Sequence, residues 1–129
     1  MNYKHARNQV YLINYHLIWC PKRRKKILVG KVKERLEEVL QEVAKEKAIE
    51  ILNLSIQADH LHLFVSCYPQ LPVHKLIKAF KGRSSRILRQ EFPHLLKLPS
   101  LWTTSYFVST AGNVSSELIQ RYIEAQAKV

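Results

Sequence analysis

The order of apolar and polar residues along the chain predicts four strands and three helices. Two segments are rich in β-branched and aromatic residues, and two others place apolar residues at alternate positions; both patterns are typical of strands. The remaining segments place apolar residues three and four positions apart, as amphipathic helices do. The predicted strands span residues 10–20, 49–57, 59–65 and 102–110, and the predicted helices span residues 32–47, 72–91 and 115–126.

The order strand–helix–strand–strand–helix–strand favours an α+β fold of the ferredoxin-like or RRM-like type. In such a fold two helices cover one face of an antiparallel sheet. We expect a single domain over residues 1–129, since a chain of this length has little room for a second core. Residues 1–110 would form the sheet-and-helix core. Residues 111–113 would act as a hinge, and the last helix would be free to lie over the open face of the sheet.

The strand over residues 49–57 is expected to have one apolar and one polar side. The predicted apolar side carries Leu52, Leu54 and Ile56, and the predicted polar side carries Asn53, Ser55 and Gln57. A tight connection at residues 57–59 leads into the next strand, which predicts an antiparallel hairpin. The polar side would then neighbour the histidines of that next strand.

The formal net charge of +11 indicates the class of partner. A small domain this basic usually binds a polyanion, most often a nucleic acid. No apolar run approaches the roughly 18–20 residues of a membrane span, and no secretory signal is visible at the N-terminus. We therefore expect a cytoplasmic protein with no membrane partner. Cys20 and Cys67 lack the CxxC spacing of a zinc site, so we expect buried thiols.

Two groups of basic residues are candidate contacts for the phosphates of a nucleic acid. One is a run of five cations that follows Pro21, and the other lies on and beside one face of the predicted helix over residues 72–91. Either group could be solvated surface charge, but the single sign of nearly all these charges favours contact with DNA. The candidate contacts are Lys22, Arg23, Arg24, Lys25, Lys26, Lys78, Lys81, Arg83 and Arg86.

Two histidines share one face of the predicted strand over residues 59–65. Side chains alternate along a strand, so His60 and His62 lie on the same side, roughly 6–7 Å apart at their Cα atoms. From there both imidazoles could bind one metal ion. Two half-exposed histidines, or one held by a backbone carbonyl, would fit the same pattern. A metal site therefore needs further ligands from elsewhere in the chain.

The last predicted helix carries Tyr122 and Gln126 four residues apart, which places them on one side of that helix. A tyrosine hydroxyl becomes a useful nucleophile when a metal and an oriented phosphate are in place. The amide oxygen of Gln126 is a suitable ligand for a hard cation. Two imidazoles, an amide oxygen, phosphate oxygens and water suit Mg²⁺ or Mn²⁺. Taken alone, the tyrosine could be a packing residue and the glutamine a surface residue.

Five motifs occur in one order between about residue 10 and residue 126. They are Tyr-His-Leu-Ile-Trp-Cys at 15–20, Asp-His-Leu-His-Leu-Phe-Val at 59–65, Lys-Gly-Arg-Ser-Ser-Arg at 81–86, Tyr-Phe-Val-Ser-Thr at 106–110 and Arg-Tyr-Ile-Glu-Ala-Gln at 121–126. In this order they resemble the single-tyrosine HUH transposases, the small TnpA-type enzymes of bacterial and archaeal insertion sequences. One departure is Ala58, where many relatives carry proline; it affects the turn and not the ligands.

The resemblance implies that His60, His62 and Gln126 hold a divalent metal and that Tyr122 attacks a phosphate of single-stranded DNA. The products would be a 5′-phosphotyrosine and a free 3′-hydroxyl, and a second transesterification would join new ends. The resemblance also implies recognition of DNA hairpins at the ends of the element, and a homodimer whose tyrosine helix docks in cis or in trans. Such an enzyme would work in the prokaryotic cytoplasm, at the nucleoid when bound to DNA.

Two alternative functions fit part of the pattern. A non-catalytic nucleic-acid-binding module of RRM-like fold would explain the charge and the aromatic strands. It would not explain why His60 and His62 share a face, or why Tyr122 and Gln126 lie one turn apart. A domesticated HUH endonuclease, which cuts repeats or processes an origin without mobilising an element, is a near variant that the sequence does not distinguish.

Overall fold

The computed structural model describes residues 5–6, 9–10, 12–110 and 116–129, so the predicted hinge at 111–113 lies outside the described residues. The elements in chain order are β1 (His5–Ala6), β2 (Gln9–Val10), β3 (Ile13–Trp19), η1 (Lys22–Arg24), α1 (Gly30–Glu46), β4 (Glu50–Gln57), β5 (His60–Cys67), α2 (Val73–Glu91), η2 (Pro93–Lys97), β6 (Phe107–Ser109), α3 (Ser116–Ala125) and η3 (Gln126–Lys128), where η marks a 3₁₀ helix.

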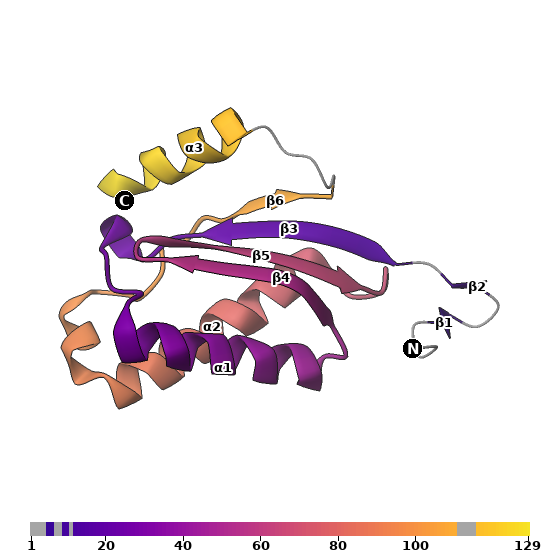
Figure 1. Ribbon diagram of the computed structural model, residues 1–129, viewed down its shortest axis with the longest axis horizontal. Helices are drawn as coiled ribbons and strands as arrows, with labels where there is room; N and C mark the ends of the chain where they lie inside the picture. The colour runs from indigo at the N-terminus through magenta and orange to yellow at the C-terminus, as the bar shows by residue number, and fades with distance from the viewer. Residues whose placement is uncertain (1–4, 7–8, 11, 111–115) are drawn as a thin grey trace.

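Four strands form one sheet in the order β4-β5-β3-β6 (Figure 1). All three neighbouring pairs in this sheet are antiparallel. The first strand of the sheet, β3, thus lies between the third and the fourth, which is the ferredoxin-like arrangement. The predicted α+β fold is confirmed. The strands β1 and β2 pair with each other in a separate small sheet.

The helices α1 and α2 cover one face of the sheet (Figure 1), and the main core lies between them and the strands. Each helix buries one apolar stripe, as the three- and four-residue spacing predicts. Fully burying one such aliphatic side chain is worth roughly 1.5–3 kcal/mol. The stripes contain Val32, Leu36, Val39, Leu40 and Val43 of α1 and Leu76, Ile77, Phe80 and Leu88 of α2, and they face Leu17, Leu61, Leu63 and Val65 of the sheet.

The strand β4 contains a bulge that changes its predicted faces. Ile51 pairs with Val65, but the next pair is formed by Asn53, so Leu52 is an extra residue without a partner in the ladder. Leu52 is 44% exposed, whereas Ile51 packs against the core. The predicted place of Leu52 on one side with Leu54 and Ile56 is therefore wrong, because a bulge inserts one residue and shifts the alternation on one side of it. The positions after the bulge keep the predicted alternation.

The fourth strand of the sheet is shorter than predicted. Only Phe107–Ser109 forms β6, and Trp102 makes an isolated bridge to Pro21. Between them the chain leaves the ladder, and the Nζ of Lys81 donates to the carbonyl oxygens of Thr103 (2.5 Å) and Ser105 (3.2 Å). The predicted strand over residues 102–110 is too long because a lysine from α2 satisfies these carbonyl groups in place of a neighbouring strand.

The helix α3 lies over the other face of the sheet, opposite α1 and α2 (Figure 1). Its Ile123 forms a second buried cluster with Ile18 and Cys20. Cys20 and Cys67 are buried free thiols, as predicted. Burial raises the pKa of Cys20 to about 12. Among the described helices, none has the length and apolarity needed to cross a bilayer.

The bulge in β4 predicts that two leucines of the sheet differ strongly in their contribution to stability. Leu63→Ala removes a fully buried side chain and should lower the free energy of unfolding by about 2–5 kcal/mol. Leu52→Ala, the matched control, should change it by only about 0.5 kcal/mol, because Leu52 is largely in solvent. Urea denaturation followed by circular dichroism measures both. Equal decreases would place Leu52 in the core and contradict the bulge.

Candidate active site

Two histidines from β5 lie side by side on the face of the sheet that α1 and α2 leave open. His60 and His62 are separated by one residue, so both point to this face, and their ring centroids are 5.1 Å apart. Both are half-buried. The cross-strand partner of His62 is Ser55 on one side and Ile18 on the other.

The imidazole of His60 contacts the carboxylate of Asp59, which forms an ion pair with Arg24. Its Nδ1 lies 2.8 Å from Oδ1 of Asp59, and Nε of Arg24 donates to the other carboxylate oxygen at 2.8 Å. Burial alone would raise the pKa of Asp59, but the hydrogen bonds from Arg24 and His60 outweigh it, and the pKa lies below its usual value. The carboxylate is therefore ionised at neutral pH.

The imidazole of His62 has a neighbour on β3. Its Nδ1 lies 3.3 Å from Nε2 of His16, and the two ring centroids are 5.5 Å apart. Burial, reinforced by repulsion from His60 and His16, lowers the pKa of His62 to about 4. Burial also lowers the pKa of His16. His62 is thus a neutral imidazole at pH 7, and a neutral imidazole is the form that binds metals.

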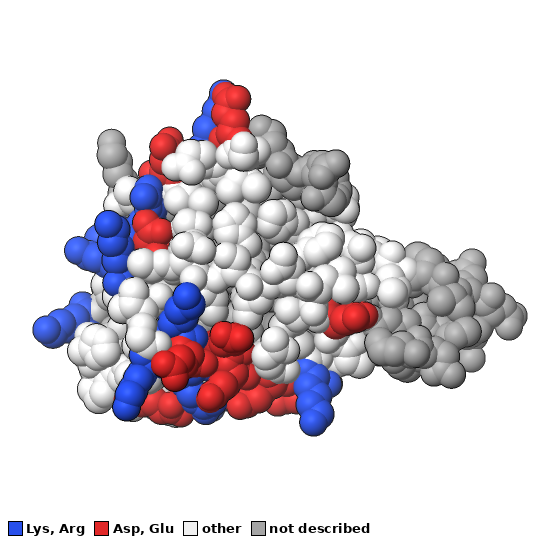
Figure 2. Space-filling model, in the orientation of Figure 1, with Lys and Arg blue, Asp and Glu red and all other residues white. Residues whose placement is uncertain are grey.

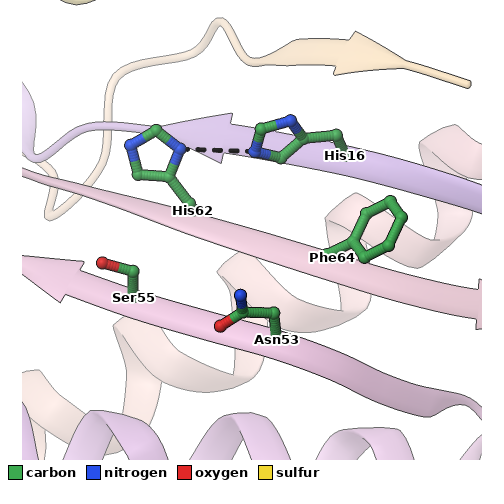
Figure 3. A pocket seen from close by; sticks show the side chains of 5 residues that line it. All are labelled: His16, Asn53, Ser55, His62 and Phe64. Carbon is green, nitrogen blue, oxygen red and sulfur yellow. Dashed lines mark hydrogen bonds between the residues drawn. The ribbon is translucent and has the colours of Figure 1, made fainter. Parts of the chain in front are cut away.

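A hollow of about 240 Å³ opens beside His62 (Figure 3). The polar side of β4 supplies part of its lining, as predicted for the hairpin with β5. His16 and Phe64 complete the wall, and their rings meet edge to face. The lining residues are His16, Asn53, Ser55, His62 and Phe64.

The C-terminal segment brings Tyr122 and Gln126 to one hydroxyl group. Ser105 Oγ lies 3.2 Å from the phenol oxygen of Tyr122 and donates to Oε1 of Gln126 at 2.8 Å. Gln126 begins η3, one turn after Tyr122, is only 6% exposed, and donates from Nε2 to the Tyr122 carbonyl at 3.0 Å. Burial raises the pKa of Tyr122, although hydrogen bonds to the hydroxyls of Ser105 and Thr103 oppose the shift.

The register of the strands shows how the tyrosine and the histidines are related. His62 is opposite Ile18 and Ile18 is opposite Phe107, so the three form one row across the open face. The ring of Tyr122 packs on Phe107, with centroids 5.9 Å apart. The row spans two strand spacings, about 10 Å. Within the described part of the chain, no hydrogen bond or ring contact joins Tyr122 or Gln126 directly to either imidazole.

The donor atoms at this face fit a divalent cation. His60 and His62 both use Nδ1 for contacts within the protein, which leaves each Nε2 for a ligand bond. No group of three or more His, Cys, Asp or Glu side chains among the described residues could hold a metal. A cation here would therefore need an oxygen ligand of another kind. The amide of Gln126 is a candidate, since its Oε1 has a second lone pair.

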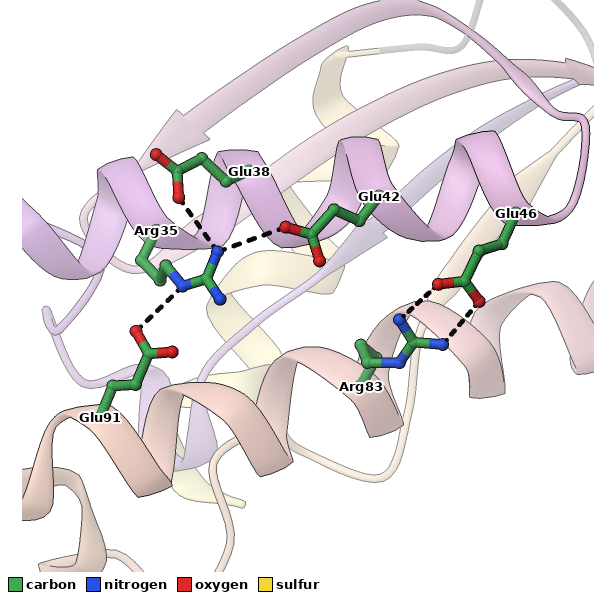
Figure 4. A network of polar contacts seen from close by, with 6 residues as sticks. All are labelled: Arg35, Glu38, Glu42, Glu46, Arg83 and Glu91. Carbon is green, nitrogen blue, oxygen red and sulfur yellow. Dashed lines mark hydrogen bonds and ion pairs between the residues drawn. The ribbon is translucent and has the colours of Figure 1, made fainter.

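The faces of the molecule differ in charge. Figure 2 shows acidic side chains gathered over α1, and lysines and arginines at the end of the molecule where η1 lies. On the outer side of α1 and α2 the opposite charges neutralise each other (Figure 4). Arg35 pairs with Glu38, Glu42 and Glu91, and Arg83 donates two hydrogen bonds of 2.8 Å to Glu46.

The predicted DNA contacts divide into two groups. Arg24, Lys81 and Arg83 have partners within the chain, namely a carboxylate, two backbone carbonyls and a second carboxylate. Burial lowers the pKa of Lys81 to about 8. The other six side chains are exposed, apart from the half-buried Lys22. They are Lys22, Arg23, Lys25, Lys26, Lys78 and Arg86. DNA contact stays a prediction for all nine.

Comparison with known proteins assigns the family. The family model described as "Transposase IS200 like" matches residues 9–126, almost the whole chain. The chain belongs to the IS200-like transposase family. The resemblance to single-tyrosine transposases that the five sequence motifs predict is thereby confirmed. The transposase is thus an enzyme of DNA transposition.

Two curated relatives carry the same function in their names. The transposase is 36% identical over 126 residues to the ISDra2 transposase TnpA of Deinococcus radiodurans, which covers 95% of this chain and 90% of that protein. It is 29% identical over 115 residues to the transposase for insertion sequence element IS200 of Salmonella typhimurium, with coverages of 87% and 75%.

Solved structures agree with the fold. A crystal structure of a Deinococcus radiodurans protein regarded as a transposase superposes with a TM-score of 0.88 at 38% identity, over 95% of this chain and 97% of that one. A REP-associated tyrosine transposase bound to a REP hairpin superposes with a TM-score of 0.59 at 12% identity, over 87% and 62% of the two chains. At that identity the second likeness shows the fold alone.

Sequence reasoning missed two residues of this face. His16 reaches His62 from the first strand of the sheet, 46 positions away in the sequence, and Ser105 lies in a stretch predicted as strand. Only the pairing register of β3 with β5 could have identified His16. For Ser105, the only local signal is its hydroxyl, a group that many surface residues carry.

The double contact of Ser105 predicts that its hydroxyl helps to hold the C-terminal helix on the sheet. Ser105→Ala removes the bonds to Tyr122 and Gln126, each worth about 0.5–1.5 kcal/mol. Amides of α3 should therefore exchange with deuterium faster in this variant. Thr104→Ala, at the exposed neighbouring position, is the matched control and should leave the exchange unchanged. Unchanged exchange in Ser105→Ala would mean that apolar packing alone holds the helix.

Proposed function

We propose that the transposase cuts and rejoins single-stranded DNA at the ends of an insertion sequence, with Tyr122 as the nucleophile. The observation that carries the proposal is the shared location of three groups. The histidine pair, the half-buried phenol and the buried Gln126 amide all belong to the face of the sheet opposite α1 and α2. Family membership supplies the reaction class, a DNA-cleaving and strand-joining reaction.

His60, His62 and Gln126 are the residues proposed to hold a divalent cation, Mg²⁺ or Mn²⁺. Two nitrogen donors and one amide oxygen leave coordination positions open for phosphate oxygens and water. When bound, such a cation polarises the scissile phosphate and stabilises the charge that develops there. The protein's own contribution is to hold the imidazole of His62 neutral and to orient the Nε2 atoms of both histidines.

In the proposed cleavage step the phenol of Tyr122 is the nucleophile. The oxygen of Tyr122 attacks the phosphorus, the bond between phosphorus and the 3′-oxygen breaks, and a 5′-phosphotyrosine forms. Burial keeps the phenol protonated at neutral pH, so its proton must leave during the attack, and the departing 3′-oxygen gains one to become a hydroxyl. A 3′-hydroxyl then attacks the phosphotyrosine, which restores Tyr122 and joins new DNA ends. The number of phosphodiester bonds is conserved, so no ATP is needed.

The distribution of charge supports a direction of approach for DNA. The outer side of α1 and α2 is acidic or neutralised and therefore unfavourable for phosphates. The exposed cations Arg23, Lys25 and Lys26 lie in η1 or directly after it, and η1 contacts η3. We propose that these cations contact the backbone of DNA hairpins at the element ends. The REP-associated transposase, which shares the fold, binds a hairpin.

The assembly and its setting are also part of the proposal. In this structure the C-terminal helix packs on its own sheet. We propose a homodimer in which the same helix can instead complete the site of a second copy, with the segment between β6 and α3 as the connection. A transposase of bacterial insertion sequences would act in the cytoplasm, at the nucleoid when bound to DNA. The same site in a domesticated protein would cut DNA without mobilising an element.

Tyr122→Phe tests the nucleophile. The variant keeps the ring that packs on Phe107 but lacks the attacking oxygen, so it should form no covalent adduct with cut single-stranded DNA. Its affinity for a hairpin should be nearly unchanged. Denaturing gel electrophoresis with end-labelled DNA measures the adduct, and a filter or gel-shift assay measures the affinity.

Two controls complete this test. Tyr106→Phe alters an exposed tyrosine outside the proposed reaction and should still form the adduct. Wild-type protein stripped of divalent cations should lose cleavage and regain it with Mn²⁺. An adduct in Tyr122→Phe would remove this residue from the reaction, and absence of any adduct in the wild type would favour a non-catalytic DNA-binding module.

Salt dependence tests the DNA contacts. Changing Lys25 and Lys26 to Gln should flatten the slope of log K against log salt by roughly 0.7–0.9 for each phosphate that the protein no longer neutralises. Arg83→Gln is the matched comparison: its guanidinium already donates to Glu46, so among the nine predicted contacts we expect it to change the slope least. A flatter slope in Arg83→Gln and an unchanged slope in the Lys25 and Lys26 variant would indicate that DNA binds on the outer side of α1 and α2.

A further inference from the structure

We propose that Asp59, anchored by Arg24, is a positioning residue that fixes the proton of His60 on Nδ1 and thereby presents Nε2 to the site. The ligand role of His60 rests on the proposed function, but the hydrogen-bonded chain itself does not. Asp59 is the only aspartate of the protein. Neither it nor Arg24 has a role in the chemistry derived above.

Each carboxylate oxygen of Asp59 has one partner. Oδ1 of Asp59 lies 2.8 Å from Nδ1 of His60, and Oδ2 accepts from Nε of Arg24 at 2.8 Å. The exposed fractions of the side chains are 13% for Asp59, 18% for His60 and 28% for Arg24. A screened surface pair would be weak, but these three groups are largely shielded from water.

The backbone around Arg24 is shaped to deliver its side chain to Asp59. Arg23 and Arg24 both have left-handed backbone angles, with φ of 56° and 54°, which residues other than glycine seldom adopt. Such conformations persist only where surrounding contacts hold them, and they gather at functional sites. Further along, the amide of Leu28 donates to the carbonyl of Ala58 at 3.0 Å, which ties this segment to the residue before Asp59.

The consequence for His60 is a single tautomer. An ionised carboxylate only accepts hydrogen bonds, so the proton between it and the imidazole must sit on Nδ1. The lone pair of Nε2 is then free. Without the carboxylate, the proton could instead occupy Nε2, the atom needed for a ligand bond. Carboxylate partners of this kind orient metal-binding histidines in other proteins.

The tautomer can be observed directly in the metal-free protein. Histidines labelled with ¹⁵N give long-range ¹H–¹⁵N correlations that distinguish the two ring nitrogens, and His60 is assigned by the disappearance of its signals in His60→Gln. At about pH 8, wild-type His60 should carry its proton on Nδ1. Asp59→Ala should show proton density on Nε2. In Asp59→Asn the amide oxygen remains the acceptor for Arg24 Nε, so the amide N–H faces Nδ1 and donates to it, and this variant should also show proton density on Nε2.

Metal affinity gives the second readout. Mn²⁺ binding, measured by titration calorimetry without DNA, should weaken by about 10–100-fold in Asp59→Ala. Arg24→Met keeps the carboxylate but removes its anchor, so the decrease in affinity should be smaller. Glu37→Ala, which removes an exposed carboxylate of α1, is the matched control and should bind as the wild type does.

The outcomes separate this inference from the proposed function. A wild-type His60 with its proton on Nε2 overturns the inference, whatever the variants do, and so does a folded Asp59→Ala with unchanged tautomer and Mn²⁺ affinity. If Asp59→Ala fails to fold, the wild-type spectrum and Asp59→Asn decide. Correct tautomer and metal binding without any tyrosine adduct would instead overturn the proposed function and leave the positioning role of Asp59 standing.

Discussion

The antiparallel register between β3 and β5 is the constraint on which the rest of the site depends. It places His62 opposite Ile18 and brings His16 into contact with the same imidazole. Ile18 then links this row to Phe107 of β6, on which the tyrosine helix packs. A shift of one residue would turn both histidines into the core and the apolar residues of β5 outward, so the buried core and the site specify the same register.

The segment around η1 connects the two halves of the site. On one side, Arg24 holds the carboxylate behind His60; on the other, the amide of Arg23 donates to the carbonyl of Val129 at the end of η3. A run of five cations would repel itself if it were only a solvated loop. Here one of its charges is neutralised by Asp59, and the exposed ones lie beside the docked C-terminal segment. The same short segment therefore anchors the carboxylate beside His60 and also carries exposed cations next to the C-terminal segment.

Local patterns predicted the elements well, and failed where a distant group changed the backbone. The periodicity of the apolar residues identified α1, α2 and the hairpin of β4 with β5. Leu52 was misplaced because a bulge, which depends on pairing with another strand, interrupts an otherwise regular alternation. The fourth strand is shorter than its sequence pattern predicts because Lys81, 22 positions away from Thr103, donates to backbone carbonyl groups that would otherwise bond to a neighbouring strand.

The sequence by itself determined the fold class, the pairing of two imidazoles on one strand face and the one-turn spacing of Tyr122 and Gln126, because these follow from the repeats of 2.0 and 3.6 residues in strands and helices. Only the tertiary structure decided which other side chains contact or support the two imidazoles, Tyr122 and Gln126. His16, Arg24 and Ser105 come from segments far apart in the chain, and their contacts arise from strand register, a left-handed turn and the docking of the last helix. No local pattern encodes such contacts, since each depends on where another part of the chain packs.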